Sequence, residues 1–158
     1  MRVAEYLAEH QVAFETLLHP LAGTAQRRAK YLHVSGKQVA KSVLLAGPQG
    51  YLLAVVPATH QVDTERLALD LGGAVRLADA REIRAMFPDC EWGVVPPFGQ
   101  LYGLPTILDE ALASDTLLVF EGSRQMEAVR LHASDFERLE RPRRLRFARR
   151  PEVEAEVR

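Results

Sequence analysis

The stretch Gly93-Val94-Val95-Pro96-Pro97-Phe98-Gly99 restricts the fold of this chain more than any other segment. Four of its seven residues are glycine or proline, although it lies in an apolar region. Glycine permits positive φ, whereas proline fixes φ and removes a hydrogen-bond donor. The segment therefore predicts a main chain of defined shape. It is either a rigid double turn between strands or a loop that presents amide and carbonyl groups to a small ligand.

A lone lysine in an apolar strand is the second informative feature. Lys41 lies between Val39-Ala40 and Val43-Leu44-Leu45, and it is one of only three lysines among 20 basic residues. A compact ammonium on a flexible stem suits this position where a guanidinium would not fit. Two readings stay open from the pattern. Lys41 lies on the exposed face of an edge strand, or it is buried and needs an anionic partner or a lowered pKa.

These two segments together resemble the YbaK/ProX family of free-standing aminoacyl-tRNA deacylases, which are related to the editing domain of bacterial prolyl-tRNA synthetases. Gly93, Pro97 and the following Gly103-Leu104-Pro105 are similar to the Gly-x-x-x-Pro loop of that family. Lys41 is similar to its lysine, and Leu18-His19-Pro20 followed by Thr24 is a weaker match. The resemblance covers about residues 19–139.

The resemblance implies a hydrolase that removes a small amino acid (alanine, serine, threonine or cysteine) from mischarged tRNA. Lys41 would hold the phosphate of the terminal adenosine, and Gly93 and Pro97 would shape a loop that positions the ester and a water nucleophile. An aminoacyl ester is already activated, so positioning and oxyanion stabilisation suffice. No metal or cofactor is expected. Further substrate-binding candidates are His19, Thr24, Ser42, Val95, Pro96, Phe98, Gly99, Asp109 and Ser123.

Each of these polar and aromatic candidates also has a structural reading. Asp109 follows an apolar strand and would cap a turn, and Thr24, Ser42 and Ser123 would bond to backbone groups. Phe98 suits core packing as well as stacking on a base. One departure from the family concerns substrate identity, because the helix after Thr24 is basic here: Ala25-Gln26-Arg27-Arg28-Ala29-Lys30.

The periodicity predicts an α+β fold with a mixed, largely antiparallel sheet curled into a barrel-like core and surrounded by helices. Helices are expected at 3–10, 22–33, 63–71, 79–87 and 134–139, with Thr24, Asp63, Asp79 and Ser134 as N-caps. Strands are expected at 42–46, 51–56, 74–77, 92–95, 106–108, 117–121 and 128–132.

The 158 residues predict a single domain over 1–140, followed by a basic tail over 141–158 without fixed structure. Residues 138–158 carry a balance of +4, against −5 for the rest of the chain. The tail is either a solvated end or a contact for phosphates. The RNA-binding candidates are Arg27, Arg28, Arg143 and Arg144.

Several classes of function are disfavoured. The chain has no Gly-x-Ser-x-Gly elbow, no Walker loop and no closely spaced histidines, and Cys90 is its single cysteine. A cytoplasmic location is expected, with aminoacyl-tRNA as partner and with neither DNA nor a membrane as partner. Whether a synthetase is also bound stays open. Two alternatives remain: a non-catalytic module that binds RNA ends, and a hydrolase of another small acyl ester.

Overall fold

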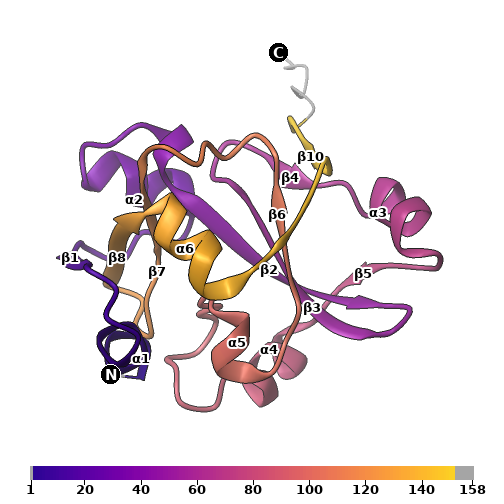
Figure 1. Ribbon diagram of the computed structural model, residues 1–158, viewed down its shortest axis with the longest axis horizontal. Helices are drawn as coiled ribbons and strands as arrows, with labels where there is room; N and C mark the ends of the chain where they lie inside the picture. The colour runs from indigo at the N-terminus through magenta and orange to yellow at the C-terminus, as the bar shows by residue number, and fades with distance from the viewer. Residues whose placement is uncertain (1, 152–158) are drawn as a thin grey trace.

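A long β-hairpin forms the centre of the molecule. The computed structural model of the chain describes residues 2–151, and Figure 1 shows β2 (Ala40–Gly47) and β3 (Gly50–Pro57) running across the middle of the fold. The two strands pair antiparallel, from Ala40 opposite Pro57 to Gly47 opposite Gly50. Its strands are rich in Val and Leu and are separated by Pro48-Gln49, which is a turn signal.

The hairpin organises a five-stranded sheet in the order β5-β2-β3-β6-β9. β5 (Arg76–Leu77) pairs antiparallel with β2, whereas β6 (Thr106–Asp109) runs parallel to β3. β9 (Arg143–Leu145) in turn runs parallel to β6. The sheet is therefore mixed, as predicted.

A second sheet of three antiparallel strands has the order β1-β8-β7, with β1 (Glu15–Leu18), β8 (Glu127–His132) and β7 (Leu117–Glu121). A parallel bridge between Val39 and Val119 joins it to the start of β2. Two short strands, β4 (Gln61–Val62) and β10 (Ala148–Arg149), form an antiparallel pair. The α+β prediction is confirmed. In the described residues these sheets, two of them joined by the Val39–Val119 bridge, make up the barrel-like core.

The helices surround the sheets, as predicted: α1 (Arg2–Glu9), α2 (Ala25–Tyr31), α3 (Thr64–Leu71), α4 (Ala80–Met86), α5 (Gly99–Tyr102) and α6 (Ala133–Glu140), with a 3-10 turn at Gly36–Gln38. Thr24, Asp63 and Asp79 cap their helices through side-chain oxygens. The cap predicted at Ser134 is wrong, because α6 begins one residue earlier and His132 takes the N-cap position without a side-chain bond.

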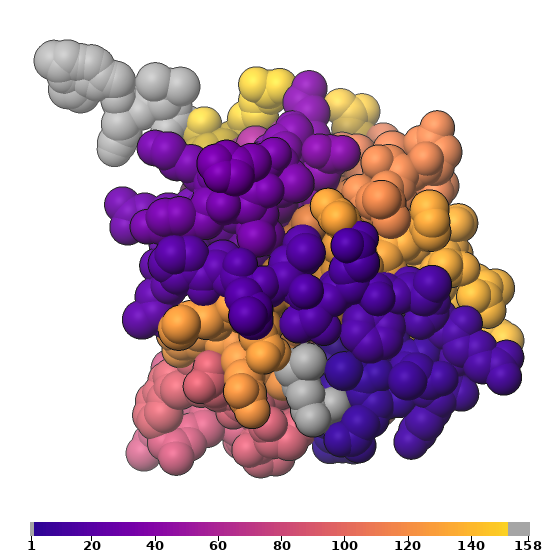
Figure 2. Space-filling model, turned by 90° about the vertical axis from the view of Figure 1, so that its left-hand side faces the viewer, coloured from indigo at the N-terminus to yellow at the C-terminus, as the bar shows by residue number. Residues whose placement is uncertain are grey.

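An aromatic cluster fills the space between α1, α6 and the three-stranded sheet. Phe98 and Phe136 are fully buried, and their ring centroids lie 5.8 Å apart. Phe120 stacks on Phe136 at 4.5 Å. Figure 2 views the molecule from the side of its early residues, and the indigo N-terminal segments lie against the orange region that contains β7 and β8. No helix in residues 2–151 is long and apolar enough to cross a bilayer.

The segment expected to be a basic tail is part of the fold up to β10, so the boundary predicted at residue 140 is wrong for the described residues. Phe147 is buried among residues of β3, α3 and β6. The buried Asp109 carboxylate holds this segment by accepting hydrogen bonds from the backbone N–H groups of Phe147 and Ala148, each at 2.8 Å. Residues 152–158 of the expected tail lie outside the described residues.

The loop that opened the sequence analysis is not preceded by a strand, so the strand predicted at 92–95 is wrong. Gly93 has φ +82°, far from the negative φ of an extended strand, and Trp92 and Gly93 form a turn. In a strand, the Val95 N–H would donate to a carbonyl oxygen of a neighbouring strand. Here it donates to the Glu121 carboxylate at 2.7 Å. Residues 94–99 are buried, and the rigid-turn reading describes their backbone.

Candidate functional site

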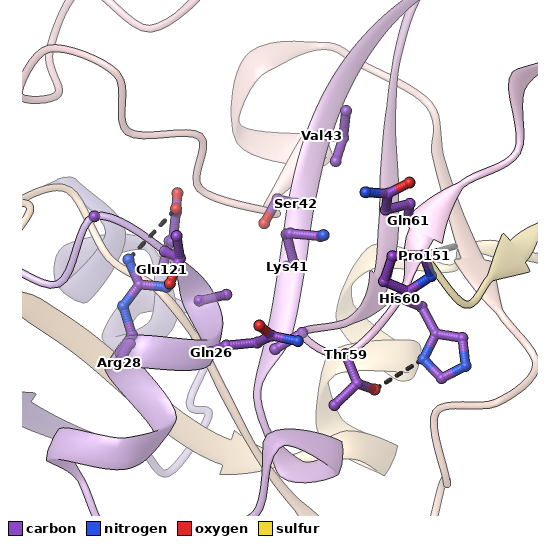
Figure 3. A pocket seen from close by; sticks show the side chains of 14 residues that line it. Gln26, Arg28, Lys41, Ser42, Val43, Thr59, His60, Gln61, Glu121 and Pro151 are labelled. Carbon is purple, nitrogen blue, oxygen red and sulfur yellow. Dashed lines mark hydrogen bonds and ion pairs between the residues drawn. The ribbon is translucent and has the colours of Figure 1, made fainter. Parts of the chain in front are cut away.

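A cavity of about 390 Å³ opens at the start of β2, where several segments meet. Its walls come from the beginning of α2, from Lys41, Ser42 and Val43 of β2, from the connection between β3 and β4, and from Glu121 at the end of β7. Figure 3 shows that Lys41 and Ser42 point to opposite sides of β2, with Arg28 and Glu121 on the Ser42 side. The cavity therefore has two chemically different halves.

On one side of β2, the Lys41 ammonium is half-buried and forms no ion pair with any residue in 2–151. Burial lowers its pKa, because a low-dielectric environment disfavours the charged form. A cation held without a counter-ion at a cavity wall is suited to bind an anionic group of a ligand. The reading of Lys41 as a freely exposed edge residue does not fit this placement.

A second hollow of about 660 Å³ adjoins Lys41 on the same side of β2. Two further cations, Arg76 of β5 and Arg149 of β10, line it together with Lys41. Arg76 is paired with Glu82 at 2.8 Å, whereas Arg149 is exposed. Lys41 thus lies where a basic hollow meets the cavity.

On the Ser42 side, a chain of polar contacts runs from the early His-Pro segment to the glycine-proline loop. The Arg28 Nε–H donates to Nε2 of the buried His19 at 3.3 Å, and His19 Nδ1 lies 2.8 Å from the Pro20 carbonyl oxygen. Arg28 Nη2 lies 3.5 Å from Glu121 Oε1. These contacts assign the proton of a neutral His19 to Nδ1, so that Nε2 can accept.

Glu121 connects this cavity to the glycine-proline loop. Its Oε2 accepts the Val95 N–H, while the same carboxylate lines the cavity. Burial raises the Glu121 pKa, and the Arg28 charge and the Val95 N–H partly oppose this shift.

The structure does not bring Gly93 and Pro97 into the cavity that Lys41 lines. Leu44 packs with Val95 in one cluster of buried residues, so the loop lies on the Ser42–Leu44 face of β2, opposite Lys41. Pro97 is buried, and Gly93 lines a separate hollow of about 130 Å³ beside Trp92. The loop therefore reaches the cavity through the Val95–Glu121 contact and not through its glycine.

Replacing Gly93 with alanine should destabilise the loop without crowding any pocket. An added Cβ would meet nothing within 4 Å, but φ +82° is strained for any residue with a side chain. The expected cost is about 1–2 kcal/mol of unfolding free energy, measured by urea denaturation. The same substitution at Gly122, whose φ is not positive and where an added Cβ would meet no atom closer than 3.8 Å, is the control for replacing a glycine with alanine. An unchanged stability for Gly93→Ala would show that the loop does not need this conformation.

The remaining predicted residues are dispersed. Thr24 and Ser42 line the cavity. Asp109 instead accepts hydrogen bonds from the backbone N–H of Ala111 in the following turn and from that of Ala148 in β10. Phe98 belongs to the core, and Gly99 packs so tightly that a Cβ would lie 2.4 Å from the Leu104 carbonyl oxygen. The others lie outside the cavity: Ser123 and Pro96 are buried, Arg27 and Arg143 are exposed, and Arg144 pairs with Glu137 at 2.8 Å.

Sequence reasoning missed Glu121 and Arg76, it included Arg149 only as part of a basic tail, and it read Arg28 as a surface contact. Arg28 lies at i+3 from the buried Ala25 and directly before the buried Ala29, on the inner face of α2. Glu121 ends an apolar strand and precedes a glycine. The sequence thus contains an arginine on an apolar helix face and an acidic residue at the end of a buried strand. Two opposite charges at buried positions each need a partner, so this pattern could have predicted their ion pair.

Solved structures share this architecture. A protein described as a candidate trans-editing enzyme for prolyl-tRNA synthetase has a TM-score of 0.81 and 22% identity, with 94% of this chain and 96% of that chain aligned. The hypothetical protein APE2540 has a TM-score of 0.84 at 18% identity, over 94% of this chain and all of that one. The chain therefore has the same fold as these two proteins.

The sequence comparisons assign the family. The model of the aminoacyl-tRNA editing domain family matches residues 19–139, and the chain belongs to this family. A proline–tRNA ligase from Thermosipho africanus is 29% identical over 80 residues, which are 50% of this chain but only 14% of that enzyme. The resemblance seen in the sequence is thus confirmed at the level of the family.

Proposed function

We propose that this chain hydrolyses the ester bond of mischarged tRNA that carries a small amino acid, namely alanine, serine, threonine or cysteine. The observation that carries the proposal is the half-buried Lys41 ammonium, which lies without an ion-pair partner in residues 2–151 at the junction of two hollows. In this role Lys41 binds the phosphate of the terminal adenosine. The cavity of about 390 Å³ then receives the ribose and the amino acid.

Hydrolysis of this ester requires positioning more than a protein nucleophile. The oxygen of a water molecule attacks the carbonyl carbon, the bond from that carbon to the ribose oxygen breaks, and the ribose oxygen leaves with a proton as a hydroxyl group. Binding the phosphate at Lys41 restricts the ester to the cavity and reduces the entropic cost of reaching this geometry. A cavity of this size is near the lower end of ligand pockets, which favours small acyl groups.

The test is a panel of aminoacyl-tRNAs incubated with the purified chain, with release of the amino acid followed over time. Esters of the four small amino acids should be cleaved faster than those of large ones. Binding of the RNA without release of any amino acid would refute the proposed hydrolysis and support a non-catalytic binding module. Cleavage of small acyl esters that lack RNA, at the same rate, would support the general esterase.

Arg149→Ala should weaken the binding of tRNA while leaving the cleavage step unchanged. Arg149 lines the basic hollow beside Lys41 and is exposed, so its charge is available to a backbone phosphate. We expect the slope of log affinity against log salt concentration to fall by about one. Arg81→Ala, which removes an exposed arginine of α4 that lines neither of these two hollows, is the matched control. If both variants had the same salt slope, the basic hollow would not be part of the RNA-binding surface.

A further inference from the structure

The Ser42 half of the cavity contains two buried polar atoms that lack a hydrogen-bond partner within residues 2–151. They are Nη1 of Arg28 and Oγ of Ser42. Each residue is only 8% exposed, and both line the cavity. A buried donor left unpaired costs about 1–3 kcal/mol, so such atoms are expected to meet an acceptor on a ligand.

An acceptor lies beside these donors. Glu121 Oε1 is 3.5 Å from Arg28 Nη2, and Oε2 accepts the Val95 N–H at 2.7 Å. A carboxylate offers about four lone-pair positions, so two known contacts leave capacity for another donor. The side chain is about one-fifth exposed, and it lines the cavity.

The cavity wall thus places an acceptor next to two free donors. An α-aminoacyl ester has the complementary pattern, because its ammonium group donates and its carbonyl oxygen accepts, and one carbon separates the groups that carry them. An ester with a hydroxyl in place of the ammonium lacks the positive charge. Charge-assisted hydrogen bonds are about twice as strong as neutral ones, so this wall can discriminate between the two.

We propose that Glu121 binds the α-ammonium group of the esterified amino acid, and that Arg28 Nη1 and Ser42 Oγ donate to its carbonyl oxygen. This inference rests on the proposed function and specifies its substrate as an acyl group with a free α-amine. Lys41, on the other side of β2, takes the phosphate, so the two ends of the substrate are held by opposite faces of one strand (Figure 3).

The electrostatics of Glu121 fit this role. Burial raises its pKa, and the positive charge of Arg28 favours the ionised form. An incoming ammonium adds a second positive charge next to the carboxylate and compensates further for its burial. The Val95 N–H fixes the carboxylate from the loop side, which gives the glycine-proline segment a positioning task at this site.

The experiment compares two probes of equal size that cannot be hydrolysed. One is adenosine 5′-phosphate with a 3′-alanylamide, and the other has a 3′-lactoylamide, in which a hydroxyl replaces the ammonium. The wild-type chain should bind the alanylamide at least about tenfold more tightly by calorimetry. Glu121→Gln, which keeps the shape of the side chain, should bring this ratio close to one.

Glu137→Gln is the matched control, because Glu137 also pairs with an arginine but lies outside the cavity. It should keep the wild-type ratio. Equal binding of the two probes by the wild-type chain would overturn the inference, as would binding of neither probe or a ratio that persists in Glu121→Gln. Thermal melting of each variant separates a change at the site from unfolding.

A parallel comparison of alanyl-tRNA with lactyl-tRNA distinguishes this inference from the proposed function. If the wild-type chain cleaves both esters at equal rates, the function stands and the inference fails. If it cleaves neither ester, the function fails, and the ratio of probe affinities still decides whether Glu121 recognises the amine.

Discussion

Lys41→Met should reduce the rate of deacylation by on the order of a hundredfold, measured as kcat/KM on an alanyl-tRNA substrate. Methionine has a similar length and no charge, so the change removes the ammonium and keeps most of the packing against β2. The cavity then loses its contact with the phosphate. The remaining cations of the basic hollow, Arg76 and Arg149, are supplied by other strands and do not replace the lost charge at the cavity wall.

The pH dependence of tRNA binding separates this electrostatic role from packing. Because burial lowers the Lys41 pKa, the ammonium loses its proton at a lower pH than an ordinary lysine does. The affinity of the wild-type chain for tRNA that carries no amino acid should therefore fall as the pH rises through the lowered pKa of Lys41. Lys41→Met, which has no titratable group at this position, should show no such fall.

Lys37→Met is the control for the loss of a lysine, because Lys37 is exposed and lines neither hollow. Its rate should match that of the wild-type chain. A Lys41→Met variant that keeps the wild-type rate, with its fold intact by circular dichroism, would exclude Lys41 from the reaction.

Asp109→Ala should lower the free energy of unfolding by about 3 kcal/mol or more. The buried carboxylate accepts from three backbone N–H groups, those of Ala111, Phe147 and Ala148, and alanine leaves all three without this acceptor. Two of the three belong to the C-terminal segment that carries Arg149. The substitution should therefore also detach β10 and weaken RNA binding.

Urea denaturation measures the stability, and hydrogen exchange at Phe147 and Ala148 measures the detachment. Asp109→Asn keeps one acceptor oxygen and should fall between alanine and the wild type. Asp115→Ala removes an exposed carboxylate and should cost less than about 0.5 kcal/mol. A stability for Asp109→Ala equal to that of Asp115→Ala would mean that the C-terminal segment does not depend on Asp109.

Much of the secondary structure followed from local signals. The two strands of the β2–β3 hairpin were predicted from the apolar runs 42–46 and 51–56, and α3 was bounded correctly by its cap at Asp63 and by Gly72, which has φ +78°. These features depend on residues within one turn or one hairpin, so the sequence contains them. The strand predicted at 92–95 failed because Val95 packs with Leu44 of β2 without joining a ladder, and because Trp92 is exposed.

The C-terminal segment shows why local signals were insufficient elsewhere. Its many arginines suggested a solvated tail, yet Phe147 and the backbone around it are held by Asp109, which is 38 residues earlier in the chain. The high arginine content of this segment correctly predicted exposed side chains. It gave no indication that the one aromatic residue of the segment is buried.

The amino-acid sequence was sufficient to predict the family and the α+β class and to single out Lys41 as a candidate, because each depends on residue types at short spacings. The composition of the cavity depended on the folded state. Arg28 and Glu121 are far apart in the chain and meet because β7 reaches α2 beside β2. Arg149 joins Lys41 because β10 pairs with β4. Such contacts follow from strand order and register, which are set by burial over the whole domain and not by any local pattern.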